Sequence, residues 1–258
     1  MSWIDFTGKI VVVTGGSGGI GRAMLDAFKA LGATVVALDY RTEDAEAAAH
    51  AVGGYGFGCD VSDLRSVEAA ADHIAKLGGA DVLVNNAGIL RPGPLEDLAI
   101  EDWQAMLKVN LDGCFITAQS FGKQMIAKGV GALVHVASIS ASQPQPFSGA
   151  YSPGKAGVAM LSRALAYEWG PKGVRSNVVS PGLVLTPMSE PFYANLEVKA
   201  ARERRVPTGR IGTAQDMANA AVFLASARAS YINGQEIVVD GGLSQTLMGS
   251  VPRPGYTQ

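Results

Sequence analysis

Short apolar runs alternate with longer amphipathic stretches along most of the chain. The length of the apolar runs and their β-branched residues are typical of strands buried on both faces, and the stretches between them repeat apolar residues at the helical period. Regular alternation of strand and helix indicates a parallel sheet with helices on both faces and right-handed crossovers. We therefore predict an α/β fold with a doubly wound parallel seven-stranded sheet, whose strands lie near residues 10 to 14, 34 to 39, 55 to 60, 81 to 85, 132 to 137, 174 to 179 and 236 to 239.

No feature of the sequence divides the chain into parts. It contains no low-complexity linker, no repeat of fixed period and no long run of charge. A length of 258 residues exceeds that of many domains, but α/β folds of this size commonly form one domain. We expect residues 1 to 258 to form a single domain.

The first predicted strand ends at a glycine-rich loop. Residues 15 to 21 read Gly-Gly-Ser-Gly-Gly-Ile-Gly, and an amphipathic stretch follows them. In this order of strand, loop and helix, glycine lets the backbone approach a pyrophosphate while the helix N-terminus faces its charge. A simple tight turn is the alternative. The context predicts a Rossmann-type dinucleotide site, with cofactor contacts from Gly15, Ser17, Gly19, Ile20 and Gly21.

The second predicted strand ends at Asp39. A carboxylate at this point can accept hydrogen bonds from an adenosine ribose, and it repels a 2′-phosphate. Asp39 therefore favours NAD over NADP as the cofactor. Two nearby cations argue in the other direction, because Arg22 and Arg41 are both close enough in sequence to meet a 2′-phosphate.

A candidate proton-transfer group lies near the middle of the chain. Tyr151 and Lys155 are four residues apart, which places them on one face of a helix, and Ser138 follows the fifth predicted strand. A cation beside a phenol favours the phenolate, so Tyr151 would act as general acid and base. Ser138 would hydrogen-bond the substrate oxygen. The spacing alone is weak evidence, because Tyr and Lys also occur at this distance by chance.

With these motifs the chain resembles the short-chain dehydrogenase/reductase family over nearly its whole length, from Gly8 to Gly242. The resemblance rests on six motifs in the family's order, which are Thr14 to Gly21, Asn85-Asn86-Ala87-Gly88, Lys108 to Leu111, the set Ser138, Tyr151 and Lys155, Pro181-Gly182, and Asn233 to Gly242. Agreement in order and spacing excludes coincidence. The resemblance implies an NAD-dependent oxidoreductase that interconverts a secondary alcohol and its ketone or lactone by hydride transfer.

The resemblance also implies roles for single residues. Asn110 would kink its helix and hold a water molecule in a proton relay from Lys155 to solvent. Lys155 would also contact the nicotinamide ribose. The other implied cofactor contacts are Asp60 and Val61 at the adenine ring, Asn86 and Gly88 under the ribose, Pro181 and Gly182 in the turn after the sixth strand, and Val184, Thr186 and Met188 over the nicotinamide carboxamide and phosphates.

The substrate pocket is expected to be built from residues 89 to 94, 140 to 149 and 183 onward, with residues 187 to 205 as a candidate mobile lid. The loop before Tyr151 is rich in Ser and Gln, and buried amides discriminate well only when a substrate supplies partners for them. We therefore expect a sugar, a polyol or another polyhydroxylated small molecule, bound by Arg91, Ser138, Ser140, Gln145 and Tyr151. Ordinary turn chemistry is the alternative for the polar loop.

Arginines in the pocket and lid segments indicate an anionic group on the substrate. Arg91 lies in the first of these segments, and Arg202, Arg204 and Arg205 close the lid segment. A carboxylate or a sulfonate would suit them. The alternative is that they are ordinary solvated or interface charges.

Two other functions compete with this interpretation. The chain could be an NADPH-dependent 3-oxoacyl thioester reductase, as many relatives are, although Asp39 argues against that cofactor. It could also be a non-catalytic dinucleotide-sensing protein. Such a protein would have no reason to keep Ser138, Tyr151, Lys155 and Asn110 together.

Composition and charge exclude further classes of function. A net charge of -2 leaves no basic face for nucleic acid. No uninterrupted apolar stretch approaches the roughly 18 residues of a membrane span, and residues 1 to 9 lack the pattern of a signal peptide. We expect a cytoplasmic protein with no nucleic-acid or membrane partner.

The cysteines and histidines do not indicate a metal site. Cys59 and Cys114 stand apart, with neither a second thiol nor a histidine at metal-binding spacing, and both are expected to be small buried side chains without a functional role. His135 lies inside the fifth predicted strand and is expected to be a hydrogen-bonded core residue. No metal is predicted.

The resemblance implies a homotetramer. The helices around residues 102 to 127 and 151 to 170 would pack against their copies, and the final strand near Ile237 would pair across another interface. Residues 243 to 258 form a tail longer than the closing strand requires. The tail could reach the pocket of a neighbouring subunit, and the alternative is a frayed terminus.

Overall fold

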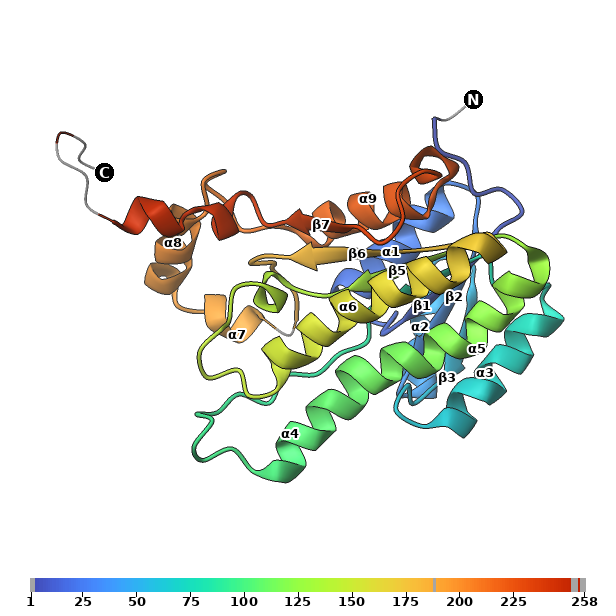
Figure 1. The fold of residues 1–258 in the computed structure, drawn as a ribbon, viewed down its shortest axis with the longest axis horizontal. Coiled ribbons are helices and arrows are strands. Elements are labelled where there is room, and N and C mark those ends of the chain that lie inside the picture. Colours follow the sequence, from blue (N-terminus) through green and yellow to red (C-terminus); the bar gives the residue numbers. More distant parts are fainter. Residues whose placement is uncertain (1–2, 188, 252–254, 256–258) are drawn as a thin grey trace.

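The sheet predicted from the sequence is present. In the computed structural model, which describes residues 3–187, 189–251 and 255, seven strands form one sheet in the order β3-β2-β1-β4-β5-β6-β7 (Figure 1). Every neighbouring pair in this order is parallel. The strands are β1 Ile10–Thr14, β2 Thr34–Asp39, β3 Tyr55–Gly58, β4 Val82–Asn85, β5 Gly131–Val136, β6 Val174–Pro181 and β7 Glu236–Val239. The chain winds outward in both directions from β1 and β4, which is the Rossmann arrangement.

Helices cover both faces of the sheet, as the alternation of patterns predicts (Figure 1). On one face of the sheet, the helices pack against alternate strand residues and form one buried hydrophobic cluster with them. On the other face, the helices pack against the intervening strand residues and form a second cluster. The first face carries α1 (Gly19–Ala30), α2 (Thr42–Ala51) and α9 (Ala214–Ala225), and the second carries α3 (Leu64–Lys76), α5 (Gly113–Lys128) and α6 (Tyr151–Trp169).

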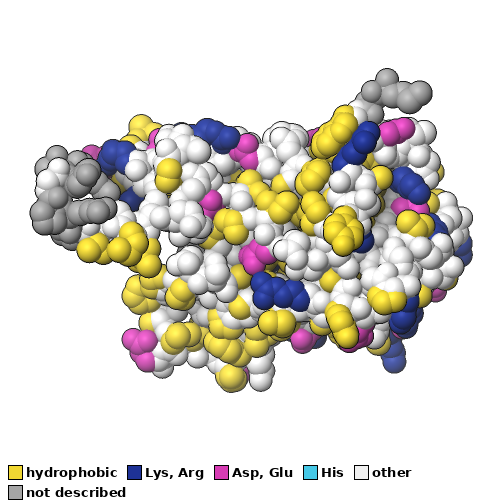
Figure 2. Space-filling view, turned by 45° about the horizontal axis from the view of Figure 1, so that its top comes forward, with side chains coloured by type: hydrophobic (Ala, Val, Ile, Leu, Met, Phe, Trp, Pro, Cys, Tyr) yellow, Lys and Arg dark blue, Asp and Glu magenta, His cyan; other side chains and the backbone are white. Residues whose placement is uncertain are grey.

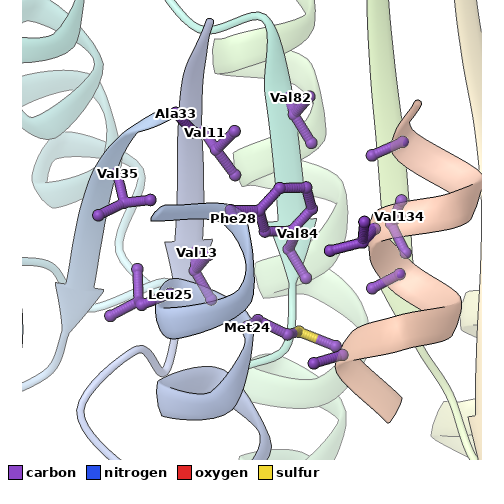
Figure 3. Packing of buried hydrophobic residues seen from close by; sticks show 14 of the residues in the cluster. Val11, Val13, Met24, Leu25, Phe28, Ala33, Val35, Val82, Val84 and Val134 are labelled. Carbon is purple, nitrogen blue, oxygen red and sulfur yellow. The ribbon is translucent and has the colours of Figure 1, made fainter. Parts of the chain in front are cut away.

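The central strand β1 shows how this burial arises. Val11 and Val13 pack with Leu25 and Phe28 of α1 (Figure 3), whereas Val12 belongs to the cluster on the opposite face. All residues of β1 are therefore buried. A strand covered on both faces needs no polar positions, and this explains why the run is continuously apolar rather than alternating.

β5 ends one residue early, at Val136, and two strands end two residues away from the predicted position. β3 ends at Gly58 instead of residue 60, because the chain turns at Asp60, whose Oδ1 accepts hydrogen bonds from Ser62 N at 2.9 Å and Ser62 Oγ at 2.7 Å. β6 continues past residue 179 to Pro181, because Val239 of β7 pairs with Pro181. Both differences lie at the carboxyl edge of the sheet, where the chain leaves the strands to form loops.

A short π-helix joins the two helices that follow β4. α4 (Ile100–Leu107) leads into the π-helical turn Lys108–Asp112, and α5 begins at Gly113. The irregularity that the family resemblance implies at Asn110 is therefore present as a π turn. Such turns occur frequently at functional sites.

Three segments near the carboxyl edge complete the fold. α6 begins at Tyr151 with Pro153 in its first turn, where proline is tolerated. The predicted lid, residues 187 to 205, contains α7 (Glu190–Tyr193) and α8 (Leu196–Arg205), and the tail contains the 3-10 turns Leu243–Gln245 and Leu247–Ser250. Figure 1 shows α7, α8 and the 3-10 turns of the tail together at one end of the molecule. Among the described residues, no helix is both long and apolar enough to cross a membrane.

Candidate active site

A cavity of about 1120 Å³ runs along the carboxyl ends of the central strands. Small-molecule sites usually measure roughly 300 to 1,000 Å³, so this cavity has room for a dinucleotide together with a second small molecule. Most of the site residues predicted from the sequence line this cavity. They are Gly15, Gly19, Ile20, Asp39, Asp60, Val61, Asn86, Gly88, Arg91, Ser138, Ser140, Gln145, Tyr151, Lys155, Pro181, Gly182, Val184 and Thr186.

A few of the predicted residues do not line the cavity. Ser17, Gly21 and Asn110 lie behind its wall and contact residues that do line it. Met188 lies outside the described residues. Tyr40, Phe192 and Tyr193 also line the cavity, although no sequence motif indicated them. Phe192 and Tyr193 could have been identified from the sequence, because they are two adjacent aromatic residues in an otherwise polar lid segment.

The glycine loop forms a cradle that side chains would fill. Gly15 has a φ of +62° and Gly19 a φ of +53°, backbone conformations that favour glycine. A Cβ atom added to Gly21 would lie 2.0 Å from the carbonyl oxygen of Gly15. Asn86 holds the loop from below, since its Nδ2 donates to the oxygens of Thr14 at 3.1 Å and Gly15 at 3.0 Å. The shape and the helix N-terminus behind it fit a dinucleotide pyrophosphate.

The lid segment closes over one point of this loop. A Cβ atom added to Gly19 would lie 3.3 Å from Thr186 Cβ and 3.6 Å from Pro187 Cδ. Thr186 is fixed in turn by Ser189, whose Oγ accepts a hydrogen bond from Thr186 N at 2.9 Å and donates to Val184 O at 2.6 Å. The start of the lid therefore adjoins the N-terminus of α1.

Asp39 is held in place at the end of β2. Its Oδ2 accepts hydrogen bonds from Ser17 N at 3.0 Å and Ser17 Oγ at 2.6 Å, and its Oδ1 accepts one from Tyr40 N at 2.8 Å. The two nearby cations that could bind a 2′-phosphate are paired with other carboxylates. Arg22 Nε lies 3.3 Å from Asp26, and Arg41 Nε lies 3.4 Å from Asp44.

The predicted proton-transfer residues come together at the ends of β5 and α6. Ser138 follows β5, is buried, and accepts a hydrogen bond at Oγ from Ser140 N at 3.1 Å. Lys155 is 3% exposed, and its Nζ donates to Val136 O at 2.8 Å while lying 5.7 Å from the centre of the Tyr151 ring. The strand and the first turn of the helix thus place a hydroxyl, a phenol and an ammonium on one cavity wall.

Asn110 ties the π turn to the loop after β4. Its Oδ1 accepts a hydrogen bond from Ile89 N at 2.8 Å, and its Nδ2 donates to Ile89 O at 2.9 Å. A Cβ atom added to Gly88 would lie 3.1 Å from Asn110 Oδ1 and 3.6 Å from Lys155 Nζ. Asn110 is fully buried, and a Cβ atom at residue 88 would crowd its Oδ1 while only touching Lys155 Nζ.

His135 is a core residue, as predicted. It is fully buried, with ring nitrogens 3.2 Å from Asn85 Nδ2 and 3.1 Å from Ser176 Oγ. Burial, together with the nearby charge of Lys155, lowers the pKa of His135 to about 4, so the ring is neutral at physiological pH. Its location inside the sheet excludes contact with a substrate.

The two thiols are buried and inert. Burial raises the pKa of Cys59 and of Cys114 to about 11, which keeps both protonated at neutral pH. Within residues 3–187, 189–251 and 255, no three His, Cys, Asp or Glu side chains gather closely enough to hold a metal ion.

The arginines expected to bind a substrate anion differ in their surroundings. Arg91 lines the cavity, but its Nη1 forms an ion pair with Asp102 Oδ1 at 2.5 Å. Arg204 and Arg205 are exposed on α8 and do not line the cavity. Arg202 lines it, and its guanidinium carbon lies 5.3 Å and 5.2 Å from the ring centres of Phe192 and Tyr193.

A comparison with protein families agrees with the fold and the site. A family model described as enoyl-(acyl carrier protein) reductase matches residues 15–244. This model covers most of the chain, including the glycine loop and the residues from Ser138 to Lys155. The chain belongs to the short-chain dehydrogenase/reductase family, for which an NAD(P) dinucleotide is the typical cofactor.

Similar proteins act on different alcohols. The chain is 43% identical over 241 residues to D-threitol dehydrogenase of Mycolicibacterium smegmatis, a match that covers 91% of this chain and 92% of that one. It is 39% identical over 249 residues to 3beta-hydroxysteroid dehydrogenase 1 of Eggerthella lenta, covering 93% and 95% of the two chains. The crystal structure of a putative NAD(P)-dependent gluconate 5-dehydrogenase from Beutenbergia cavernae with bound NADP is 39% identical, has a TM-score of 0.86, and is matched over 93% of this chain and 98% of that one.

Proposed function

We propose that this protein is an NAD-dependent dehydrogenase that interconverts a secondary alcohol of a sugar, polyol or other polyhydroxylated small molecule with its ketone or lactone. The observation that carries the proposal is the meeting of Ser138, Tyr151 and Lys155 on one wall of the cavity whose other end is the glycine cradle. A non-catalytic dinucleotide-sensing protein would not need this set of residues.

The roles of the residues follow from their positions. Ser138 Oγ donates a hydrogen bond to the substrate oxygen and holds it beside the phenol oxygen of Tyr151, which removes the hydroxyl proton during oxidation and returns it during reduction. When bound, the nicotinamide cofactor supplies the hydride acceptor or donor. Lys155 Nζ donates one of its three N–H groups to Val136 O, and the other two are available to ribose hydroxyls and to water. Asn110 holds this water near Lys155, so that the proton can reach solvent.

Support for NAD comes from the charges around the end of β2. A 2′-phosphate would lie near the Asp39 carboxylate, and two like charges 4 Å apart repel by about 4 kcal/mol at an effective dielectric of 20. Both arginines that could offset this repulsion are already paired, Arg22 with Asp26 and Arg41 with Asp44. The Asp39 carboxylate would instead accept hydrogen bonds from the ribose hydroxyls.

Support for a polyhydroxylated substrate comes from the polar wall next to Ser138. Ser140 Oγ donates to Gln145 Oε1 at 3.2 Å, and both side chains line the cavity, as does Gln143. Hydroxyl groups satisfy such amides, whereas an aliphatic or steroid surface would leave them without partners. The similarity to D-threitol dehydrogenase agrees with this choice.

A homotetramer is part of the proposal. The outer faces of α5 and α6 expose Phe115, Met160 and Tyr167, and the edge strand β7 exposes Val238. Large apolar side chains gathered on two helices and an unpaired strand edge indicate contact with further copies of the chain. A cytoplasmic location remains an expectation from the sequence.

The proposal is tested by initial rates of NAD and NADP reduction over alditols, aldonates and simple secondary alcohols, followed through absorbance of the reduced cofactor. We expect kcat/KM with NAD to exceed that with NADP by about 100-fold or more, and turnover only with polyhydroxylated compounds. NADPH-dependent reduction of an acetoacetyl thioester would instead identify a 3-oxoacyl thioester reductase. Turnover of 3β-hydroxysteroids alone would contradict the substrate class.

A further inference from the structure

Arg202 is the arginine whose surroundings best fit a binding role. It lies on α8, and its guanidinium rests against the rings of Phe192 and Tyr193 on α7. Aromatic rings cover the faces of a guanidinium but leave its N–H groups free, because these point outward in the plane of the group. The two rings therefore hold the Arg202 side chain at the cavity wall with its donors available.

Arg202 also differs in its charge balance from Arg91, the other arginine that lines the cavity. In the described part of the chain, no carboxylate lies within ion-pair distance of Arg202, and the side chain makes only the two ring contacts. Arg91 is neutralised by Asp102, and the acidic neighbour Glu203 faces Lys199 at 3.9 Å. A partly buried guanidinium at a cavity without a counterion is a site for an anion.

The carboxylates of the cavity lie at its opposite end. Asp39 and Asp60 are the acidic residues among those that line it, and both belong to the adenosine half of the dinucleotide cradle. The other half contains the ammonium of Lys155 and the guanidinium of Arg202. The loop between β5 and α6, which carries Ser140 and Gln145, lines the same cavity as Phe192, Tyr193 and Arg202. The charged side chains that line the substrate end of the cavity are therefore cations.

We propose that Arg202 is a specificity-determining residue that binds the carboxylate of a sugar acid, while the hydroxyl to be oxidised lies between Ser138 and Tyr151. The planar guanidinium can donate two parallel hydrogen bonds to a planar carboxylate, a geometry that an ammonium cannot provide. This inference deepens the proposed function and rests on it. Of the arginines that the sequence indicated for an anion, it selects Arg202 of the lid and leaves out Arg91, which is paired with Asp102.

The test compares matched substrates in the purified full-length protein. For wild type, Arg202→Gln, Arg202→Lys and Arg204→Gln, kcat/KM with NAD is measured for aldonates and for alditols of the same carbon number and configuration. Arg204 is the control, because it carries the same charge on the same helix but does not line the cavity. The equilibrium dissociation constant of NADH is measured for each variant by fluorescence.

We expect the wild type to prefer the aldonate, and Arg202→Gln to lower the ratio of aldonate to alditol kcat/KM by about 10- to 100-fold, mainly through KM. Arg202→Lys should recover part of the ratio, because it keeps the charge and loses the planar fork. Arg204→Gln should leave the ratio and both rates unchanged. The dissociation constant of NADH should stay constant throughout.

Three results would overturn the inference. Equal losses for aldonate and alditol in Arg202→Gln would mean that Arg202 supports the lid without recognising the charge. Weaker NADH binding in this variant alone would assign Arg202 to the cofactor pyrophosphate, and a preference for a phosphorylated polyol would name a different anion. In each of these cases turnover of polyhydroxylated substrates persists and the proposed function stands, whereas absence of any such turnover by the wild type would refute both.

Discussion

At the scale of single residues, the sequence predicted which side chains lie together at the site, but not which charged side chains form ion pairs there. Spacing and family resemblance identified Ser138, Tyr151 and Lys155, and the strand ends bring them to one wall. The pairing of Arg91 with Asp102 was not predicted, because it depends on how the loop after β4 lies against α4. Whether a charged side chain is free is a property of tertiary contacts and not of the local pattern.

Tyr151→Phe removes only the phenol oxygen and keeps the ring beside Lys155. We expect kcat to fall by about 10³-fold or more, which is within the usual contribution of a positioned acid or base, because no other group is available to take the hydroxyl proton. The dissociation constant of NADH, measured by fluorescence, should change less than threefold. Retained turnover would remove Tyr151 from the mechanism.

Asp39→Asn removes the charge that repels a 2′-phosphate while keeping an acceptor for Ser17. We expect the ratio of kcat/KM with NAD to that with NADP to fall by about 10- to 100-fold, mainly through better use of NADP. Asp72→Asn changes the net charge equally at an exposed position of α3 and should leave the ratio unchanged. The measurement is the initial rate with each cofactor on one substrate. An unchanged ratio in Asp39→Asn would place cofactor selection elsewhere.

At the scale of elements, the alternation of apolar runs predicted the sheet because both of its faces are covered. The same alternation did not predict where strands end, because hydrogen bonds in the loops determine these positions. The Asp60 carboxylate ends β3 early by accepting bonds from Ser62, and no periodicity reports such a bond. The conformation of the lid could not be predicted either, since α8 has no buried residue and its position depends on contacts with the rest of the molecule.

Alanine substitutions at two glycines of the loop test whether close packing within the glycine cradle stabilises the protein. In Gly21→Ala the added Cβ would lie 2.0 Å from Gly15 O, so strand, loop and helix cannot keep their present arrangement. We expect the protein without cofactor to lose about 2 kcal/mol or more of unfolding free energy, a cost typical of overpacking a buried site. In Gly18→Ala the added Cβ meets nothing within 4 Å and φ is -147°, so stability should change by less than about 0.5 kcal/mol. Urea unfolding of both variants measures the difference, and equal stabilities would contradict the close packing at Gly21.

At the scale of the whole molecule, a buried polar group links stability to pH. His135 stands inside the sheet between Asn85 of β4 and Ser176 of β6. Its pKa is about 4 in the folded protein and 6.5 in the reference state. Between these values the unfolded chain binds a proton at this residue and the folded protein does not, so the free energy of unfolding falls as the pH is lowered through this window.

This one residue should account for a loss of up to about 3 kcal/mol between pH 7 and pH 4. His135→Asn is expected to be less stable than wild type at pH 7, because it disturbs buried hydrogen bonds, yet its stability should depend less on pH in this range. His50→Gln, which changes an exposed histidine, should keep the slope of the wild type. Denaturant unfolding at several pH values gives the slopes, and identical slopes for His135→Asn and wild type would show that His135 is not the group responsible.

The contact between the lid and the glycine loop has a consequence for the timing of the reaction. Thr186 and Pro187 lie beside Gly19 of the cradle, and the same segment continues into the helices that carry Phe192, Tyr193 and Arg202. A dinucleotide bound in the cradle therefore contacts the beginning of the segment that forms the far wall for the second molecule. Binding is expected to follow a compulsory order, in which the cofactor enters first and leaves last, and the substrate meets a completed pocket only after the cofactor has arrived.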